Sequence, residues 1–228
     1  MAAMGGMTMP GGWTLSMAWM RMPWQSWLGV AAAFVGMWTA MMAAMMLPAL
    51  VPMLGRYRSA VAGAARRDAF TARVAAGYFG VWLALGAAVF AAGALLAALA
   101  LRHPALTRGE PLAAGVALLL AGVFQCSRSK AHWLACCRDA PAQANALATH
   151  GDTAWRHGLR LGLDCVACCA GLTVALIVAG SMDLRVMALA AAAITAERLA
   201  PQGERVARAI GLLLVIAGLW AAVRAIGS

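Results

Sequence analysis

Charged residues are scarce in this 228-residue chain: they make up 11% of it, against a hydrophobic share of 64%. Soluble globular domains carry roughly 25% charged residues, so the composition excludes an ordinary soluble domain. Two stretches hold no charge at all, one between Arg21 and Arg56 and one between Arg73 and Arg102. Each exceeds the ~20 residues that a helix needs to cross a bilayer. The chain is therefore predicted to be an integral membrane protein.

Acidic residues are scarcer than basic ones, eight against eighteen, and the net charge is +10. Such an excess can indicate nucleic-acid binding, but no stacking aromatic residues interleave with the basic ones and no binding motif is present. A nucleic-acid partner is therefore not expected. The chain also lacks a Walker motif, so we do not expect it to drive transport with ATP by itself.

The uncharged runs predict the fold class, an all-α polytopic bundle of about six transmembrane spans, with five as the alternative. The two long runs give spans near 27–53 and 74–101, and shorter runs give spans near 111–127, 165–182, 186–196 and 209–223. Residues 27–228 then form the transmembrane helical domain. Residues 1–26 form a Met- and Gly-rich N-terminal arm, in which Trp24, together with Trp27, resembles an interfacial anchor. The arm lacks an early basic region, so a cleaved signal peptide is not expected.

The distribution of the basic residues predicts the orientation. With six spans and an external N-terminus, thirteen basic residues fall in inner loops: Arg56, Arg58, Arg66, Arg67, Arg73, Arg128, Lys130, Arg138, Arg156, Arg160, Arg198, Arg205 and Arg208. Five fall outside: Arg21, Arg102, Arg108, Arg185 and Arg224. Because basic loops stay in the cytoplasm, we expect a bacterial-type inner (plasma) membrane, surrounding lipid, cytoplasmic basic loops and two non-cytoplasmic termini.

Three of the six cysteines stand close together, at Cys165, Cys168 and Cys169, where a charge-free run begins. Positions i, i+3 and i+4 of a helix share one face, so three sulfur atoms can point to one place. Soft ligands of this kind favour Cu(I), zinc or an iron–sulfur cluster. Four of the six cysteines lie in or near inner loops, so reduced thiols are expected rather than disulfides. The alternative is that these cysteines only pack as small apolar residues.

Methionines in the first span provide a second set of soft ligands. Met42 and Met46 are spaced i, i+4, Met53 continues that stripe, and Met41 and Met45 form an adjacent one. The alternation of spans brings the end of span one, Cys126, Cys165 and Glu197 to the same membrane edge. Thioethers and thiolates together suit Cu(I), whereas zinc more often recruits four Cys or His ligands. The alternative is that methionine fills packing gaps.

Other polar residues gave weaker predictions. The segment 127–156 is predicted to be the longest inner loop, in contact with water or a partner, and its adjacent Cys136 and Cys137 form a weak motif because their side chains diverge. His132, His150 and His157 are expected to be solvated, and His103 lies on the opposite side.

Asp164 and Glu197 are functional candidates because carboxylates are costly in hydrocarbon. Alternatively, Arg160 pairs with Asp164 and Arg198 pairs with Glu197. Pro48 and Pro52 are expected to kink or unwind span one.

Five separated elements give the chain a resemblance to a known family. They are Ala44-Met45-Met46-Leu47-Pro48, then Gln125 with Lys130 and Cys136, then His157-Gly158 before Cys165, Cys168 and Cys169, then Gly180-x-Met182, and last Glu197-x-x-x-Pro201. In this order they resemble a family of predicted metal-binding integral membrane proteins, some labelled copper chaperones, over about residues 24–218. The chain departs from the family pattern at Ala170-Gly171-Leu172, at Arg198 in place of lysine, and at the compressed Cys136-Cys137 pair. The resemblance implies a metal-handling role.

Three functions compete at this stage. The first is a non-enzymatic membrane protein that binds, stores or delivers Cu(I), with a copper-enzyme assembly factor as partner. The metal ligands would be Cys165, Cys168 and Cys169, with Met41, Met42, Met45, Met46, Met53 and Glu197 as further candidates. The second is a structural or assembly subunit of a larger membrane complex. The third is a membrane thiol oxidoreductase, which requires an accessible reactive thiol.

Overall fold

The chain forms an all-α bundle, as predicted. The computed structural model describes residues 7–8, 14–15, 26–60, 67–102, 109–143, 151–179 and 184–227. The helices are α1 (Trp27–Ala60), α2 (Arg67–Arg102), α4 (Glu110–Cys126), α5 (Arg128–Gln143), α6 (Gly151–Ala179), α7 (Leu184–Leu199) and α8 (Gly203–Gly227). Two short strands, β1 (Met7–Thr8) and β2 (Thr14–Leu15), pair antiparallel outside the bundle. Trp24, His103, His150, Gly180, Met182 and the residues of the predicted arm other than 7–8, 14–15 and 26 lie outside the described residues.

Fewer helices than predicted are long and apolar enough to cross a membrane. Within the described ranges, four helices are long and apolar enough, namely α1, α2, α6 and α8. The bent pair of α4 and α5 brings the number to five if it counts as one span. Six spans are therefore not supported. The predicted fifth span corresponds to α7, whose 16 residues fall short of the ~20 needed for a crossing.

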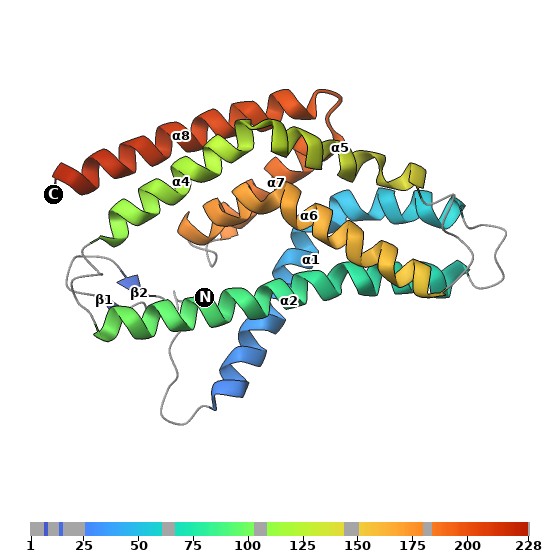
Figure 1. Cartoon of the computed structure of the whole chain (residues 1–228), viewed down its shortest axis with the longest axis horizontal. Helices are drawn as coiled ribbons and strands as arrows, with labels where there is room; N and C mark the ends of the chain where they lie inside the picture. Colours follow the sequence, from blue (N-terminus) through green and yellow to red (C-terminus); the bar gives the residue numbers. More distant parts are fainter. Residues whose placement is uncertain are drawn as a thin grey trace.

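Helix α1 bends in the middle rather than unwinding. It is helical from Trp27 to Ala60 with Pro48 and Pro52 inside it, and its membrane-length part ends at Pro48. Figure 1 shows α1 changing direction between its dark-blue first part and its cyan last part. A proline inside a helix removes a backbone hydrogen bond and crowds the preceding turn, which accounts for the bend.

Two close helix pairs organise the bundle, the parallel pair α2 with α6 and the antiparallel pair α4 with α8 (Figure 1). Glycines make both contacts close, because a Cβ at Gly158 of α6 would clash with the carbonyl oxygen of Val74, and one at Gly122 of α4 would lie 2.7 Å from the backbone of Gly211. Membrane helices approach each other through small residues in this way. Gly158 therefore lets α6 approach α2 closely.

Substituting Gly158 with alanine is expected to destabilise the bundle by about 1–3 kcal/mol, because the new methyl group would force α6 away from α2. The matched control is Gly36→Ala in α1, where no described atom lies within 4 Å of the added carbon. Both changes improve helix propensity by about 1 kcal/mol, so the difference isolates packing. Thermal unfolding in detergent, followed by helical circular dichroism, measures it. Equal midpoints for the two variants would contradict the close contact.

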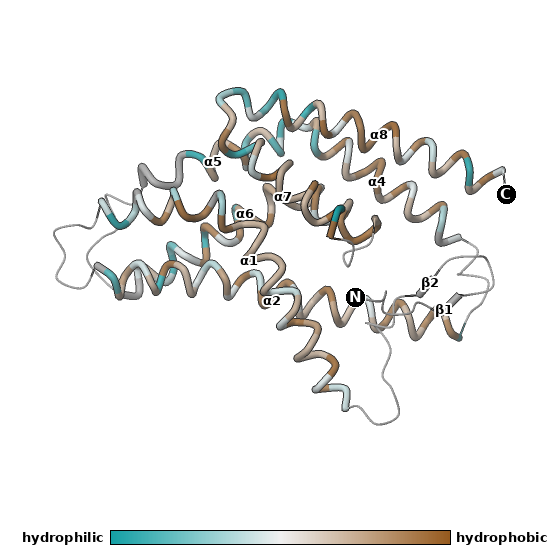
Figure 2. Tube along the Cα trace, turned by 180° about the vertical axis from the view of Figure 1, so that it is seen from behind, coloured by the Kyte–Doolittle hydropathy of each residue, from teal (hydrophilic) through white to brown (hydrophobic). Residues whose placement is uncertain are grey.

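The predicted inner loop 127–156 is mostly helical, and this prediction was wrong. Residues 128–143 form α5, and α6 already begins at Gly151. Lys130, Leu134 and Cys137 recur at helical spacing and place one side of α5 against the bundle, where Lys130 is only 1% exposed. Figure 2 shows hydrophilic residues gathered at α5 and at the beginning of α8, whereas apolar residues dominate the long helices.

Candidate metal centre

The three clustered cysteines lie in the interior of the bundle. Cys165 stands near the middle of the 29-residue helix α6, so the prediction that these cysteines open their span was wrong. Each of Cys165, Cys168 and Cys169 is 1% exposed. All six cysteines of the chain are free thiols, in agreement with the expectation of no disulfides.

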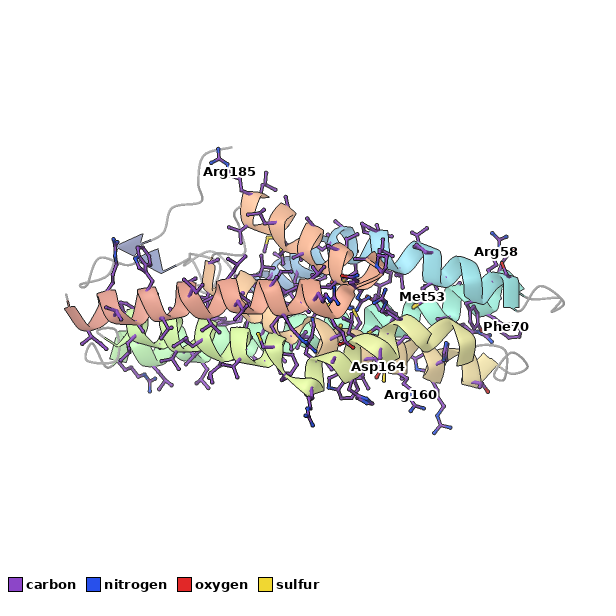
Figure 3. All side chains as sticks on the ribbon, turned by 90° about the horizontal axis from the view of Figure 1, so that it is seen from above. Met53, Arg58, Phe70, Arg160, Asp164 and Arg185 are labelled. Atoms are coloured by element: carbon purple, nitrogen blue, oxygen red, sulfur yellow. The ribbon has the colours of Figure 1, made fainter. Side chains whose placement is uncertain are left out.

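One predicted methionine meets the cysteines directly. The Cys165 thiol donates to the Met46 sulfur across 3.9 Å, and it forms a 3.0 Å hydrogen bond with the Tyr78 hydroxyl of α2. Among the other predicted methionines, Met41, Met42 and Met45 are buried in the same core. Met53 is half-buried, follows Pro52 in α1, and packs against the edge of this core. Figure 3 labels its position.

A single cationic side chain connects the sulfur atoms. Arg198 of α7 directs its Nη2 atom at Cys165 Sγ at 2.9 Å, at Cys169 Sγ at 3.7 Å and at Cys137 Sγ at 3.6 Å. The guanidinium is a positive charge with several donors, so it compensates negative charge on thiolates. Sequence reasoning paired Arg198 with Glu197, and that prediction was wrong.

Cys137 is the functional candidate that sequence reasoning undervalued. It stands on α5, beside Cys168 and in contact with Arg198. Cys136 and Cys137 do diverge, as predicted, but the divergence turns Cys137 toward the sulfur cluster. A signal was available, because Lys130 and Cys137 are seven residues apart and therefore share a helix face.

Glu197 belongs to a separate buried network, within which it is 1% exposed. Lys130 Nζ donates to Glu197 Oε2 at 2.6 Å and to the backbone oxygen of Cys168 at 2.6 Å. Gln125 Nε2 donates to Glu197 Oε1. The network joins α4, α5, α6 and α7 directly beside the thiols. Because both Glu197 oxygens already accept hydrogen bonds, a structural role fits this carboxylate better than metal ligation.

The remaining polar candidates lie around this centre. His157 is buried and stacks on Tyr57 with ring centroids 5.8 Å apart, so its predicted solvation was wrong. His132 is exposed on α5, as expected. Asp164 is half-buried and lies within electrostatic range of Arg160, and the pair stays a prediction. Figure 3 shows Asp164 nearer the middle of the molecule than Arg58 and Phe70.

The donor set fits a soft metal ion, although the sulfur atoms are not yet arranged as ligands. No group of three Cys, His, Asp or Glu side chains surrounds a common metal position in the described parts of the chain. The physical reason is that Arg198 Nη2 stands between Cys165, Cys169 and Cys137, at 2.9–3.7 Å from their sulfur atoms. A metal–thiolate bond is about 2.3 Å long, so ligation requires the guanidinium to leave and the thiols to draw together.

A comparison with known protein families shows the family to which the chain belongs. A family model described as copper chaperone (PpoB2) matches residues 35–221. The chain belongs to this copper chaperone family. The match covers every helix that contributes to the sulfur cluster, and it confirms the resemblance drawn from the sequence motifs. No curated protein and no solved structure matches the chain. The family name suggests copper, and soft sulfur donors are chemically suited to that metal.

Proposed function

We propose that this chain is an integral membrane, non-enzymatic Cu(I) chaperone, which holds the ion between α5 and α6 and delivers it to a protein that assembles a copper enzyme. One observation carries the proposal: a single buried nitrogen of Arg198 lies within 3.7 Å of three cysteine sulfur atoms from two helices. Cys165, Cys169 and Cys137 are the proposed principal ligands. Cys168 lies beside Cys137, and the Met46 thioether is next to Cys165.

The chemistry of these donors favours Cu(I) over zinc. Thiolates and thioethers are soft ligands, and Cu(I) is the softer ion. Structural zinc sites use four ligands, most often cysteines completed by histidines. The nearest described histidine contact to a thiol is between His132 and Cys136, on the exposed side of α5. The interior donors are therefore sulfur alone.

Arg198 balances charge in this proposal. Two or three thiolates binding one Cu(I) leave a net negative charge in the bundle, and an uncompensated buried charge is costly. When the ion enters, the guanidinium moves off the sulfur atoms but stays close enough to offset that charge. The Arg198 guanidinium, which contacts the sulfur atoms before copper binds, thus becomes the counterion of the copper complex.

The membrane orientation proposed from the sequence fits the helix arrangement. Arg58 and Arg138 lie in the last parts of α1 and α5, and Arg205 lies in the first turn of α8. Hydrophilic residues gather at α5 and at the beginning of α8 (Figure 2). With basic residues on the cytoplasmic side of an inner membrane, the beginning of α1 and the end of α8 would lie on the other side, which requires α7 and the segments flanking it to lead the chain back across. The sulfur cluster would then receive copper from, or release it to, the basic side.

Cu(I) loading of the purified chain tests the function. The full chain in detergent is incubated with Cu(I) under reducing, anaerobic conditions, competed with a Cu(I) chelator, and analysed for copper per chain. We expect copper to resist the chelator, whereas a zinc load under the same conditions should be removed. Copper retention no higher than that of an unrelated polytopic membrane protein would overturn the proposal.

Replacing Arg198 with methionine is expected to weaken Cu(I) binding by about 10- to 100-fold, the range typical of residues that support metal ligands. It should also increase the number of protons released per bound ion, because thiols that lack the guanidinium hold their protons until copper displaces them. Arg198→Lys keeps the charge and should retain most of the affinity. Proton release is measured by titration in weak buffer. An unchanged number of released protons in the Arg198→Met variant would contradict the proposed role of Arg198 at the copper site.

A further inference from the structure

The buried position of the sulfur cluster creates a problem of access. Cys165 and Cys169 are each 1% exposed, so an ion can reach them only through intermediate ligands. Free Cu(I) is not expected to cross such an interior alone, since each step needs soft donors. Helix α5 is the element that carries thiols both at the cluster and toward the outside.

The outward side of α5 presents a pair of metal-binding side chains. His132 and Cys136 are spaced i, i+4, and His132 Nε2 lies 3.7 Å from Cys136 Sγ. His132 is exposed and Cys136 half-buried. Taking about 2.3 Å for a metal–sulfur bond and about 2.0 Å for a metal–imidazole bond, as at zinc sites, this separation gives an angle of about 120° at a shared ion. The pair is thus already spaced for one metal ion, with a further coordination position left open.

A carboxylate that also interacts with Arg160 lies within electrostatic range of the pair. The negative charge of Asp164, on the neighbouring helix α6, is close enough to interact with His132. A carboxylate near a ligating imidazole is a common supporting feature of metal sites. The next residue after Cys136 is Cys137, which contacts Arg198 at the sulfur cluster. One helical turn therefore carries donors from the exposed surface to the buried thiols.

We propose that His132 and Cys136 form a second, exposed Cu(I) site from which the ion passes to Cys137 and then to Cys165. The route rests on the proposed function, whereas the site itself stands on its own geometry. Transfer is ligand exchange without redox change. A Cu–S bond to Cys137 forms as the Cu–N bond to His132 breaks, and a bond to Cys165 then replaces the bond to Cys136. The incoming thiols lose protons, and Cys136 regains one.

The experiment isolates the outer pair by removing the inner thiols. The full chain with Cys137, Cys165, Cys168 and Cys169 all changed to serine is loaded with Cu(I), and its metal is examined by X-ray absorption. We expect one weakly held ion with one imidazole nitrogen and one sulfur as protein ligands. His132→Gln or Cys136→Ser, added to this background, should remove it. Cys126→Ser is the matched control, since this exposed thiol has Gly122 rather than a histidine at i−4.

A kinetic measurement in the otherwise unaltered chain guards against misfolding of the fourfold variant. The His132→Gln/Cys136→Ser variant should load the buried cluster at least about ten-fold more slowly, because a nearby outer site raises the local concentration of the ion. Its final copper content in the cluster should match that of the wild type. Outer-pair variants that lose no copper in the fourfold background and load at the wild-type rate would overturn this second site. A wild-type chain that retains no copper would instead contradict the proposed function alone.

Discussion

Changing Cys165, Cys168 and Cys169 together to serine is expected to abolish tight Cu(I) binding, with a loss of at least about a thousand-fold in affinity, or about 4 kcal/mol. Serine keeps the size of cysteine but replaces a soft sulfur with a hard hydroxyl oxygen, which Cu(I) binds poorly. Cys137 and Met46 remain, but they stand on different helices and lose the thiol between them. Chelator competition, read as copper per chain, measures the change.

Single substitutions should rank the three cysteines by their contacts. Cys165 touches Met46, Tyr78 and Arg198, so its change to serine should cost the most. Cys126→Ser, at an exposed thiol of α4, should leave copper binding unaltered. If the triple variant keeps wild-type copper, the thiols only pack between helices, and the structural-subunit hypothesis gains support.

Changing Lys130 to methionine is expected to destabilise the fold by about 3–5 kcal/mol, because it strands the Glu197 carboxylate as an unpaired buried charge. The two side chains are at most 2% exposed and lie 2.6 Å apart. The change also removes the hydrogen bond to the Cys168 backbone oxygen. Denaturant titration in detergent, followed by helical circular dichroism, measures the loss.

Two controls separate this pair from ordinary charge effects. Adding Glu197→Gln to the Lys130→Met variant removes both charges and should restore much of the stability. Glu204→Gln breaks the exposed Arg208–Glu204 pair, 3.5 Å long, and should cost less than about 1 kcal/mol. A Lys130→Met variant no less stable than Glu204→Gln would show that the buried charge is solvated or neutral.

Much of the fold follows from single-sequence reasoning, because long uncharged runs have few alternatives to membrane-length helices. The exceptions have physical causes. Helix α7 has an apolar run typical of a span but only 16 residues. Helix α5 looked like a loop because polar residues dominate it, and its inward side became visible only through the spacing of Lys130, Leu134 and Cys137.

The candidate site was predictable where it depends on helical spacing within one element. The spacing of Cys165 and Cys169 places both on one face, and the structure brings Met46 to that face. The approach of Arg198 was not predictable, since a residue's partners across helices depend on how α7 rotates against α6. Lys130 offered a clue, because it is the chain's single lysine, and the structure buries it.

The adjacency of Glu197 and Arg198 determines how the centre can open. Glu197 is clamped by Lys130 and Gln125, so the backbone of α7 is fixed one residue before the guanidinium. Arg198 Nε is buried and has no hydrogen-bond partner within the described structure. The Arg198 guanidinium can therefore leave the sulfur atoms by rotation about its own side-chain bonds. The backbone of α7 and the other helices of the bundle need not move.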